Sequence, residues 1–578
     1  MPVGTYNGPD RLVFAIDLGT TMTAVAYAHL RMGAIPQFRM VTRWPGQEDA
    51  QGECKVPTAV RYDYNGQPVH FGAEAVDVEH EQDGPLATWF KLWLHPEELR
   101  DTYGLEAPAL PEGVPLERVY SDFLHYVFKH AQQFVKNVAM SNEVQENYDI
   151  VMAIPNAWDN RQQTFIRNAA VAANIFPRNF DPRRLLFVSE SEASVHFAIE
   201  HVPDIGAWLR PNTTFAVLDA GGSTVDTTLY KCIKTWPKLQ LVEVTASECV
   251  QAGSALLDQD IENLVKKKLE TWKGVTPFYI SAIVAEWEKK TKRKFNRGGR
   301  DVVIAIGQDR ITFTNSEVSD IFHRPVSAII SSVEAALSRL DKDVTCTALL
   351  MVGGFAESAY LRDFLGLCLN KHNVKQIMMD EATKKAAAEG ACIWYSKQYV
   401  VARAARTTYG VRVDEDYDVK KYPYHRARPP CVDEDDGRLR AEDVFSVLVR
   451  KNQIVQNDEA VSFPYFELYE KNPSPRELGD FSCELLYCDA PIPPNYAADL
   501  EGALLPSVRH ACTLKADLSR LYNNLEVKRH QRTGKPYWRL NFKVEVFFGQ
   551  TSLCANLVWN ENGKVKKGSV SVIPDSVV

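Results

Sequence analysis

Three short glycine turns occur in fixed order along the 578 residues; the first two begin with aspartate, and an apolar run precedes each of the three. The turns comprise residues 17–21, 219–226 and 352–355, after apolar runs at 12–16, 215–218 and 348–352. Short apolar runs of this kind predict buried strands. Each turn would then lie at the carboxyl end of a strand, which is where α/β sheets bind ligands.

The first two turns are each succeeded by a run of similar composition. Residues 23–27 and 227–230 are rich in Thr, Val and Tyr, which favours a second strand and therefore a hairpin around each turn. The dinucleotide fingerprint and the Walker loop both open a helix directly after their glycines, so this context excludes them. The two hairpins predict an internal duplication.

The length and charge of the chain limit the classes of protein to which it can belong. At 578 residues with 45% hydrophobic content, the chain predicts several domains. A formal net charge of -8 argues against a dedicated polyanion binder. The start lacks the pattern of a secretory signal and no apolar stretch is long enough for a membrane span. The 11 scattered cysteines predict reduced thiols in a cytoplasmic protein, with the nucleus as a further location.

Strand-to-helix units fill the intervals between the turns. Apolar residues at 149–154 and 185–188 predict strands, and helical patterns follow at 163–175 and 191–200. After the third turn, apolar residues recur at i, i+3, i+4 and i+7 from Leu361, which predicts a helix whose amino end points at the glycines.

The sequence pattern changes near Thr407. Helical periodicity fades, and an acidic, proline-containing stretch includes residues 433–437, which predicts an exposed loop. Alternating runs at 444–449, 538–548 and 552–558 then predict strands, with Asn562-Gly563 as a two-residue turn. The carboxyl region is therefore expected to be mostly β.

The turns carry a specific chemistry. An aspartate at a strand end offers a carboxylate to Mg²⁺ or its waters, while the following amides and hydroxyls suit phosphate oxygens. A single Asp-x-Gly turn is often an ordinary hairpin. Two matched hairpins followed by a third glycine pair favour a nucleotide site in which a triphosphate is bound from both sides.

These motifs resemble the phosphate and adenosine motifs of the actin, hexokinase and heat-shock ATPase superfamily. Within it, the chain is most similar to the seventy-kilodalton heat-shock (DnaK-type) chaperones and to their divergent twelve-A and twelve-B branch. The resemblance rests on residues 151–158, 188–193, 352–358 and 408–411. It covers about residues 12–411 well and the remainder loosely.

The resemblance implies an α/β fold: an actin-like, ribonuclease-H-like duplicated two-lobed ATPase domain followed by a β-rich C-terminal domain. We expect the nucleotide-binding domain at 1–411, a linker and acidic loop at 412–440, and a β-rich substrate- or partner-binding domain at 441–578. The cofactors implied are ATP or ADP and Mg²⁺.

The resemblance also implies roles for individual residues. The metal and its waters would lie near Asp17 and Asp219. The catalytic set would be Lys91, Glu190, Thr224 and Asp226. The remaining nucleotide contacts would be Gly19, Thr20, Thr21, Gly221, Gly222, Ser223, Glu288, Lys292, Gly353, Gly354 and Phe355.

Alternatives remain for three of these groups. Lys91 follows two aromatic residues and suits a surface lysine whose stem covers apolar surface. Glu190 suits a charge at a helix amino end. The basic run around Lys292 suits a nucleic-acid contact, although a solvated helix face is favoured because no aromatic residues provide stacking.

Several positions depart from the chaperone pattern. Met22 stands where an aromatic is common, Ser191 replaces a proline, and Gln163 and Glu357 each replace an arginine. Residues 412–416 are polar where the chaperones have an apolar linker. We expect these changes to affect nucleotide binding less than they affect coupling between domains.

The favoured function is an ATP-binding, slowly hydrolysing, chaperone-like protein. The alternatives are a nucleotide-dependent adaptor or sensor with little hydrolysis and, less favoured, a sugar kinase. The partners expected are a protein or peptide client at the C-terminal β domain and co-chaperones, with no nucleic acid and no membrane span.

Overall fold

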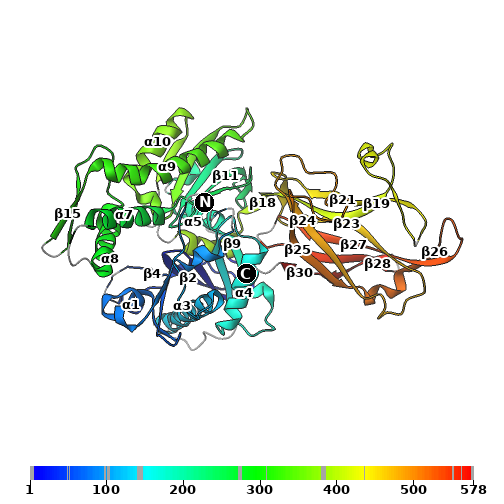
Figure 1. The fold of residues 1–578 in the computed structure, drawn as a ribbon, viewed down its shortest axis with the longest axis horizontal. Coiled ribbons are helices and arrows are strands. Elements are labelled where there is room, and N and C mark those ends of the chain that lie inside the picture. Colours follow the sequence, from blue (N-terminus) through cyan, green and yellow to red (C-terminus); the bar gives the residue numbers. More distant parts are fainter. Residues whose placement is uncertain are drawn as a thin grey trace. The chain divides into compact units, whose positions relative to one another are not determined.

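A computed structural model provides the structure of the chain. It describes residues 5–48, 50, 52–96, 99, 104–139, 148–202, 204–270, 272, 276–306, 309–378, 386–434, 436–549, 552–561 and 563–574. The fold is mixed α/β and divides into two compact units (Figure 1). The first unit comprises residues 1–243 and 247–401, and the second comprises residues 244–246 and 402–578.

The first unit contains a sheet built around the first predicted hairpin. β1 pairs antiparallel with β2, and β8 and β9 extend the sheet in parallel, in the order β3-β2-β1-β8-β9. The bounds are β1 Arg11–Leu18, β2 Met22–Leu30, β3 Phe38–Met40, β8 Tyr148–Ile154 and β9 Leu185–Ser189. β4 (Lys55–Pro57) also pairs with β2.

A second sheet in this unit repeats the pattern around the second hairpin. β10 pairs antiparallel with β11, and β16 and β17 extend the sheet in parallel, in the order β17-β16-β10-β11-β12. The bounds are β10 Thr214–Ala220, β11 Val225–Lys234, β12 Gln240–Glu243, β16 Cys346–Val352 and β17 Lys375–Met378, with β13 (Glu248–Val250) on β11. The same strand order therefore recurs around both predicted hairpins.

Two helices pack closely within the first unit. α5 (Glu190–His201) and α11 (Ala386–Lys397) cross where Gly390 faces the backbone of Ala193. A Cβ at Gly390 would lie 1.9 Å from the Ala193 carbonyl oxygen, so only glycine permits this approach. Apolar residues of both helices join the core of the first sheet, and those of α5 also join the core of the second.

The remaining elements of the first unit surround these sheets. The helices are α1 Gly72–Val76, α3 Leu116–Ala139, α4 Asn160–Ala172, α6 Ile205–Trp208, α7 Ser254–Leu269, α8 Pro277–Glu286, α9 Asn315–Ser338 and α10 Ala359–Lys371. Short 3-10 helices include η1 (Val78–Asp83), η2 (Phe90–Leu94) and η5 (Phe355–Glu357). Smaller sheets contain β5 (Ala59–Tyr62), β6 (Pro68–Phe71) and β7 (Leu86–Thr88), and β14 (Val302–Ile306) with β15 (Asp309–Phe313).

The described part of the second unit is built from strands and short 3-10 helices, as the alternating runs predict. One sheet has the order β20-β21-β19-β24-β25-β30 and the other β23-β27-β28-β29, with β26 on β27. The bounds are β19 Thr408–Asp416, β20 Cys431–Val432, β21 Leu439–Val449, β23 Val461–Tyr469, β24 Asp480–Cys488, β25 Val508–Asp517, β26 Leu525–Arg529, β27 Pro536–Phe547, β28 Cys554–Glu561, β29 Lys564–Ser569 and β30 Ser571–Pro574.

Residues 412–440 lie within the second unit and contribute strand residues to its first sheet. Of the predicted turn before β29, Gly563 adopts a positive φ of 76°, whereas Asn562 lies outside the described residues. Across the described ranges, no helix has the length and hydropathy that crossing a bilayer requires.

Candidate functional site

A large cavity in the first unit brings the predicted site residues together. Its volume is about 1110 Å³, and cavities of several hundred cubic ångströms or more suit small-molecule ligands. Every predicted site residue except Asp226 lines it: Asp17, Gly19, Thr20, Thr21, Lys91, Glu190, Asp219, Gly221, Gly222, Ser223, Thr224, Glu288, Lys292, Gly353, Gly354 and Phe355.

The three glycine turns meet at the cavity. A Cβ at Gly222 would lie 3.1 Å from Thr21 Oγ1, so the first and second turns face each other closely. Gly353 has a φ of 88°, and a Cβ there would lie 2.4 Å from the Ala220 carbonyl oxygen and 2.7 Å from Asp219 Oδ1. Glycine at these two positions therefore allows the three turns to approach one another closely.

Backbone hydrogen bonds from the amino end of α7 fix the second turn. The backbone N–H groups of Gly253, Ser254 and Ala255 donate to the carbonyls of Ser223, Gly221 and Gly222, at 2.9, 3.1 and 2.7 Å. With its carbonyls bound in this way, the turn keeps a fixed shape. Such preorganisation lowers the entropy lost when a ligand binds.

Three carboxylates converge in the cavity. The pKa of Asp219 is raised to about 7, first by burial and then by the nearby charges of Glu190 and Asp17, while a hydrogen bond from Ser194 Oγ at 2.6 Å opposes the rise. Carboxylates that repel each other in this way favour the binding of a cation between them. A hard divalent cation with oxygen ligands, such as Mg²⁺, fits this donor set.

Lys91 and Glu190 form a buried ion pair. Lys91 Nζ lies 2.7 Å from Glu190 Oε1, and the two side chains are only 5% and 13% exposed. The pKa of Glu190 is raised by burial, and the charge of Lys91 opposes that rise. The ammonium also lies 5.4 Å from the centre of the Trp158 ring. Lys91 is therefore not a surface lysine, and Glu190, the first residue of α5, points its carboxylate into the cavity.

Lys55 is a cavity residue that sequence reasoning missed. It comes from β4, and its Nζ lies 3.4 Å from Asp17 Oδ2. Burial opposes the charge of Lys55, but Asp17 favours it, and the pKa of the lysine is raised overall. Nothing in the spacing between positions 17 and 55 indicates this contact, because the pairing of β4 with β2 creates it.

A second group that the sequence did not reveal supports Ser223. The indole Nε1 of Trp158 donates to His95 Nδ1 at 3.0 Å, and His95 Nε2 lies 3.1 Å from Ser223 Oγ. Because Nδ1 accepts a hydrogen bond, the neutral imidazole carries its proton on Nε2, which then donates to the serine. The contacts span residues far apart in the chain, and only the sheet topology brings them together.

Glu288 and Lys292 also line the cavity. Lys292 Nζ contacts both carboxylate oxygens of Asp258, at 2.8 and 2.7 Å, and Asp258 is buried. Burial and the charge of Asp258 raise the pKa of Glu288 to about 7, against the charge of Lys292. Glu357 pairs with Arg293 at 3.1 Å, so an arginine still lies beside the third turn even though position 357 holds an acid.

Asp226 lies apart from the cavity lining. It is directly opposite Asp219 in the β10–β11 hairpin and is 1% exposed. Directly paired residues of antiparallel strands project to the same face of the sheet. Asp226 therefore lies beside Asp219 on the same face of the hairpin, although it does not line the cavity.

The similar proteins found for this chain share one family name. No family model matches the chain. Over 655 aligned residues it is 22% identical to "Heat shock 70 kDa protein 12B" of Homo sapiens, covering 97% of this chain and 91% of that protein. The chain resembles the twelve-A and twelve-B branch of the seventy-kilodalton heat-shock proteins. "Heat shock 70 kDa protein 12A" of Mus musculus and of Homo sapiens are each 22% identical over 551 residues, covering 78% of this chain and 79% of each protein.

Proposed function

We propose that the protein binds ATP with Mg²⁺ and hydrolyses it slowly, as a chaperone-like protein of the seventy-kilodalton heat-shock type. The observation that carries this proposal is the cavity where the two phosphate turns face each other beside three converging carboxylates. We further propose that the first unit is an actin-like ATPase domain whose two similar sheets form its two lobes. The repeated strand order supports that interpretation.

The turns would hold the phosphate groups. Backbone amides and the hydroxyls of Thr20, Thr21 and Thr224 provide donors, and the facing approach of the turns encloses a triphosphate from two sides. Asp17 and Asp219 would hold Mg²⁺, directly or through water, and the cation would neutralise phosphate charge and offset the repulsion between the carboxylates. ADP would occupy the same turns.

Lys91 would place a positive charge beside the transferring phosphoryl group. Its bond to Glu190 fixes the ammonium before substrate arrives, so little reorganisation accompanies the reaction. Thr224, at the end of the second turn, would contact the phosphoryl group that meets the attacking water. Asp226 would accept a proton from that water through an intervening group, since it does not itself line the cavity.

Glu288, Lys292 and the third turn would contact the adenosine. Lys292 is already paired with Asp258, so its ammonium would reach the ribose while keeping that carboxylate as a partner. Gly354 offers open space on its Cβ side, and Phe355 is buried at the start of η5. A planar base would lie against this backbone.

Two measurements test the proposal. The melting temperature of the full chain should rise with ATP and Mg²⁺, because a ligand bound only by the native state stabilises it. Steady-state release of phosphate should fall at least about tenfold in Thr224→Ala and Asp226→Ala. Absence of a thermal shift with ATP, ADP or a non-hydrolysable analogue would contradict nucleotide binding.

The position of Asp226 favours one alternative. A carboxylate that does not line the cavity suits a nucleotide-dependent adaptor or sensor that binds ATP and hydrolyses little of it. Turnover by the wild type equal to that of the two variants, together with an intact thermal shift, would favour this alternative.

We propose that the second unit, which is built from two β-sheets, contacts a protein or peptide client, and that co-chaperones act on the first unit. An exposed sheet edge accepts an added strand. We place the protein in the cytoplasm, and also the nucleus, because all 11 cysteines are free thiols. Crosslinking of a panel of unfolded peptides to the full chain, with and without ATP, tests the client site.

A further inference from the structure

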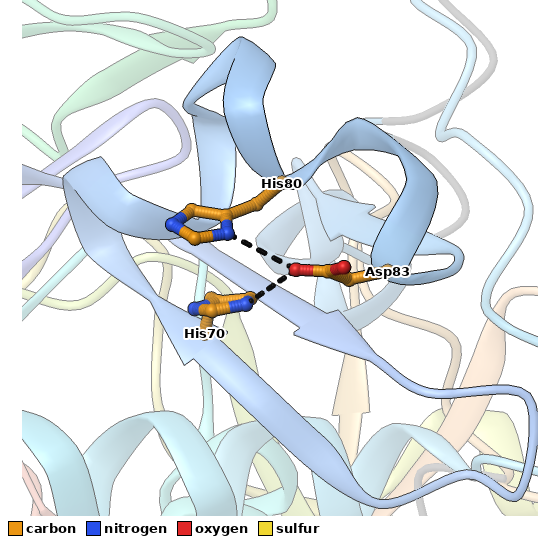
Figure 2. Close-up of side chains that lie close together, drawn as sticks. All are labelled: His70, His80 and Asp83. Carbon is orange, nitrogen blue, oxygen red and sulfur yellow. Dashed lines mark hydrogen bonds and ion pairs between the residues drawn. The ribbon is translucent and has the colours of Figure 1, made fainter.

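Two histidines and an aspartate form a cluster outside the carboxylate site (Figure 2). His70 lies on β6, and His80 and Asp83 lie on η1. His70 Nε2 and His80 Nδ1 lie 2.8 and 3.0 Å from the same oxygen, Asp83 Oδ2. The two imidazole rings stack with centroids 3.7 Å apart. Two imidazole nitrogens thus converge on one carboxylate oxygen, and the three atoms lie within 4.8 Å of one another.

The donor set has the chemistry of a transition-metal site. Imidazole nitrogen is a preferred ligand of Zn²⁺ and similar cations, and an aspartate oxygen commonly completes the set. The hydrogen bonds from both histidines hold the pKa of Asp83 below its usual range, so the carboxylate stays ionised. By contrast, the predicted ligands Asp17 and Asp219 offer oxygen atoms only, which suits Mg²⁺.

The two nitrogen-to-oxygen distances are close to those between ligands of one metal ion. Ligands about 2.0 Å from a tetrahedral metal lie about 3.3 Å from each other. The two nitrogen-to-oxygen distances of 2.8 and 3.0 Å therefore need to open by only a few tenths of an ångström. The rings, now inclined at 24°, must also tilt so that both lone pairs converge. The side chains of His70, His80 and Asp83 are 22%, 34% and 43% exposed, so they have room for this movement.

The backbone that carries the cluster is fixed by a buried arginine. Arg61 Nη1 donates to the carbonyls of Gly84 at 2.8 Å and Glu81 at 3.4 Å, and its Nε donates to that of Ala75 at 3.0 Å. Asp77 caps the start of η1 by accepting from the Glu79 N–H. With the backbone held on both sides, metal binding requires side-chain rotation alone.

We propose that His70, His80 and Asp83 bind one Zn²⁺ ion or a divalent cation of similar chemistry. The three protein ligands leave a fourth position for water. On binding, each neutral histidine carries its single proton on the ring nitrogen that faces away from Asp83, so that the nitrogen now facing Asp83 offers its lone pair to the ion. Since Asp77 and Glu81 of the same segment line the large cavity, the ion also stiffens one edge of that cavity.

A second cluster serves as an internal comparison. One ligand atom each from Glu334, Cys368 and His372 also lies within 4.8 Å of the others. Burial and then the neighbouring Glu334 raise the pKa of the Cys368 thiol to about 11. The thiol therefore stays protonated at neutral pH, and a metal ligand must be a thiolate. The structure favours the cluster at His70.

The test uses the full chain without a histidine tag and without nucleotide, because both bind Zn²⁺ themselves. Titration with Zn²⁺ at neutral pH, followed by calorimetry, should give one saturable site per chain. Affinity should fall at least about tenfold in His80→Ala and in Asp83→Asn. The variant His372→Ala should bind like the wild type, and an excess of Mg²⁺ should not displace the ion.

Co²⁺ provides a second readout. Bound to nitrogen and oxygen ligands in a tetrahedral site, it gives visible absorption bands that the His70→Ala variant should lose. Far-ultraviolet circular dichroism of each variant checks that it folds. Equal affinity in wild type and His80→Ala, loss of binding in His372→Ala alone, or displacement by Mg²⁺ would each overturn the assignment.

Discussion

Replacing Asp219 by asparagine should stabilise the nucleotide-free protein while removing its response to Mg²⁺. Burial and the charges of Glu190 and Asp17 raise the pKa of Asp219 from 3.8 to about 7. Between those values the folded state holds a proton that the unfolded state has released, so stability falls as the pH rises. Above a pH of about 7, the ionised Asp219 lowers the stability of the folded state by its full amount.

The size of the effect follows from that shift. A difference of about three pKa units is worth on the order of 4 kcal/mol above a pH of about 7, and about 2 kcal/mol at a pH near 5.5. The asparagine side chain carries no charge, and its oxygen still accepts the hydrogen bond from Ser194. For a cooperative unit of about 400 residues, 4 kcal/mol raises the melting temperature by about 5 °C.

Calorimetry of wild type and Asp219→Asn at pH values of about 5.5 and 8 measures this difference. The increase should be larger at the higher pH, and addition of ATP with Mg²⁺ should shift the wild type more than the variant. Asp258→Asn is the matched control, because removing that buried carboxylate leaves Lys292 without its ion-pair partner and should lower the melting temperature. A variant at position 219 that melts at or below the wild type at the higher pH would refute the reasoning.

Three further substitutions test the walls of the cavity. Lys91→Ala should lower stability by about 3 kcal/mol, because Glu190 is left buried and unpaired. Adding Glu190→Gln to this variant should restore its stability, measured by urea unfolding, but should not restore phosphate release. Gly353→Ala should lower stability by about 3 kcal/mol, since its φ is positive and a Cβ meets a backbone carbonyl. A Cβ at Gly354 meets no other atom, so Gly354→Ala should change stability little. Equal melting temperatures for the two variants would contradict this prediction. Trp158→Phe should lower stability by about 1 kcal/mol by removing one buried hydrogen bond, and an unchanged unfolding midpoint would show that the bond is not needed.

The sequence predicted the local elements of the first unit well. The two hairpins around residues 17–21 and 219–226, and the strands at 149–154 and 185–188, are present with small changes in their bounds. These elements depend on local patterns, because apolar runs favour strands and glycine turns favour hairpins. The helix expected after the third turn is also present, although η5 separates it from the glycines.

The contacts between distant residues were not predictable in the same way. Lys55 with Asp17, Lys292 with Asp258, and His95 with Ser223 join positions that share no sequence pattern. The raised pKa of Asp219 is also invisible in the sequence, because it depends on burial and on two carboxylates from other elements.

By itself, the sequence determined which residue types stand at strand ends, because short-range patterning decides where the chain turns and which groups the turn presents. Only the tertiary structure decided which of those groups meet. The pairing of strands in two similar sheets places the first turn against the second and the third against Asp219. Charge, burial and hydrogen-bond partners then follow from that placement, since each depends on neighbours that are distant along the chain.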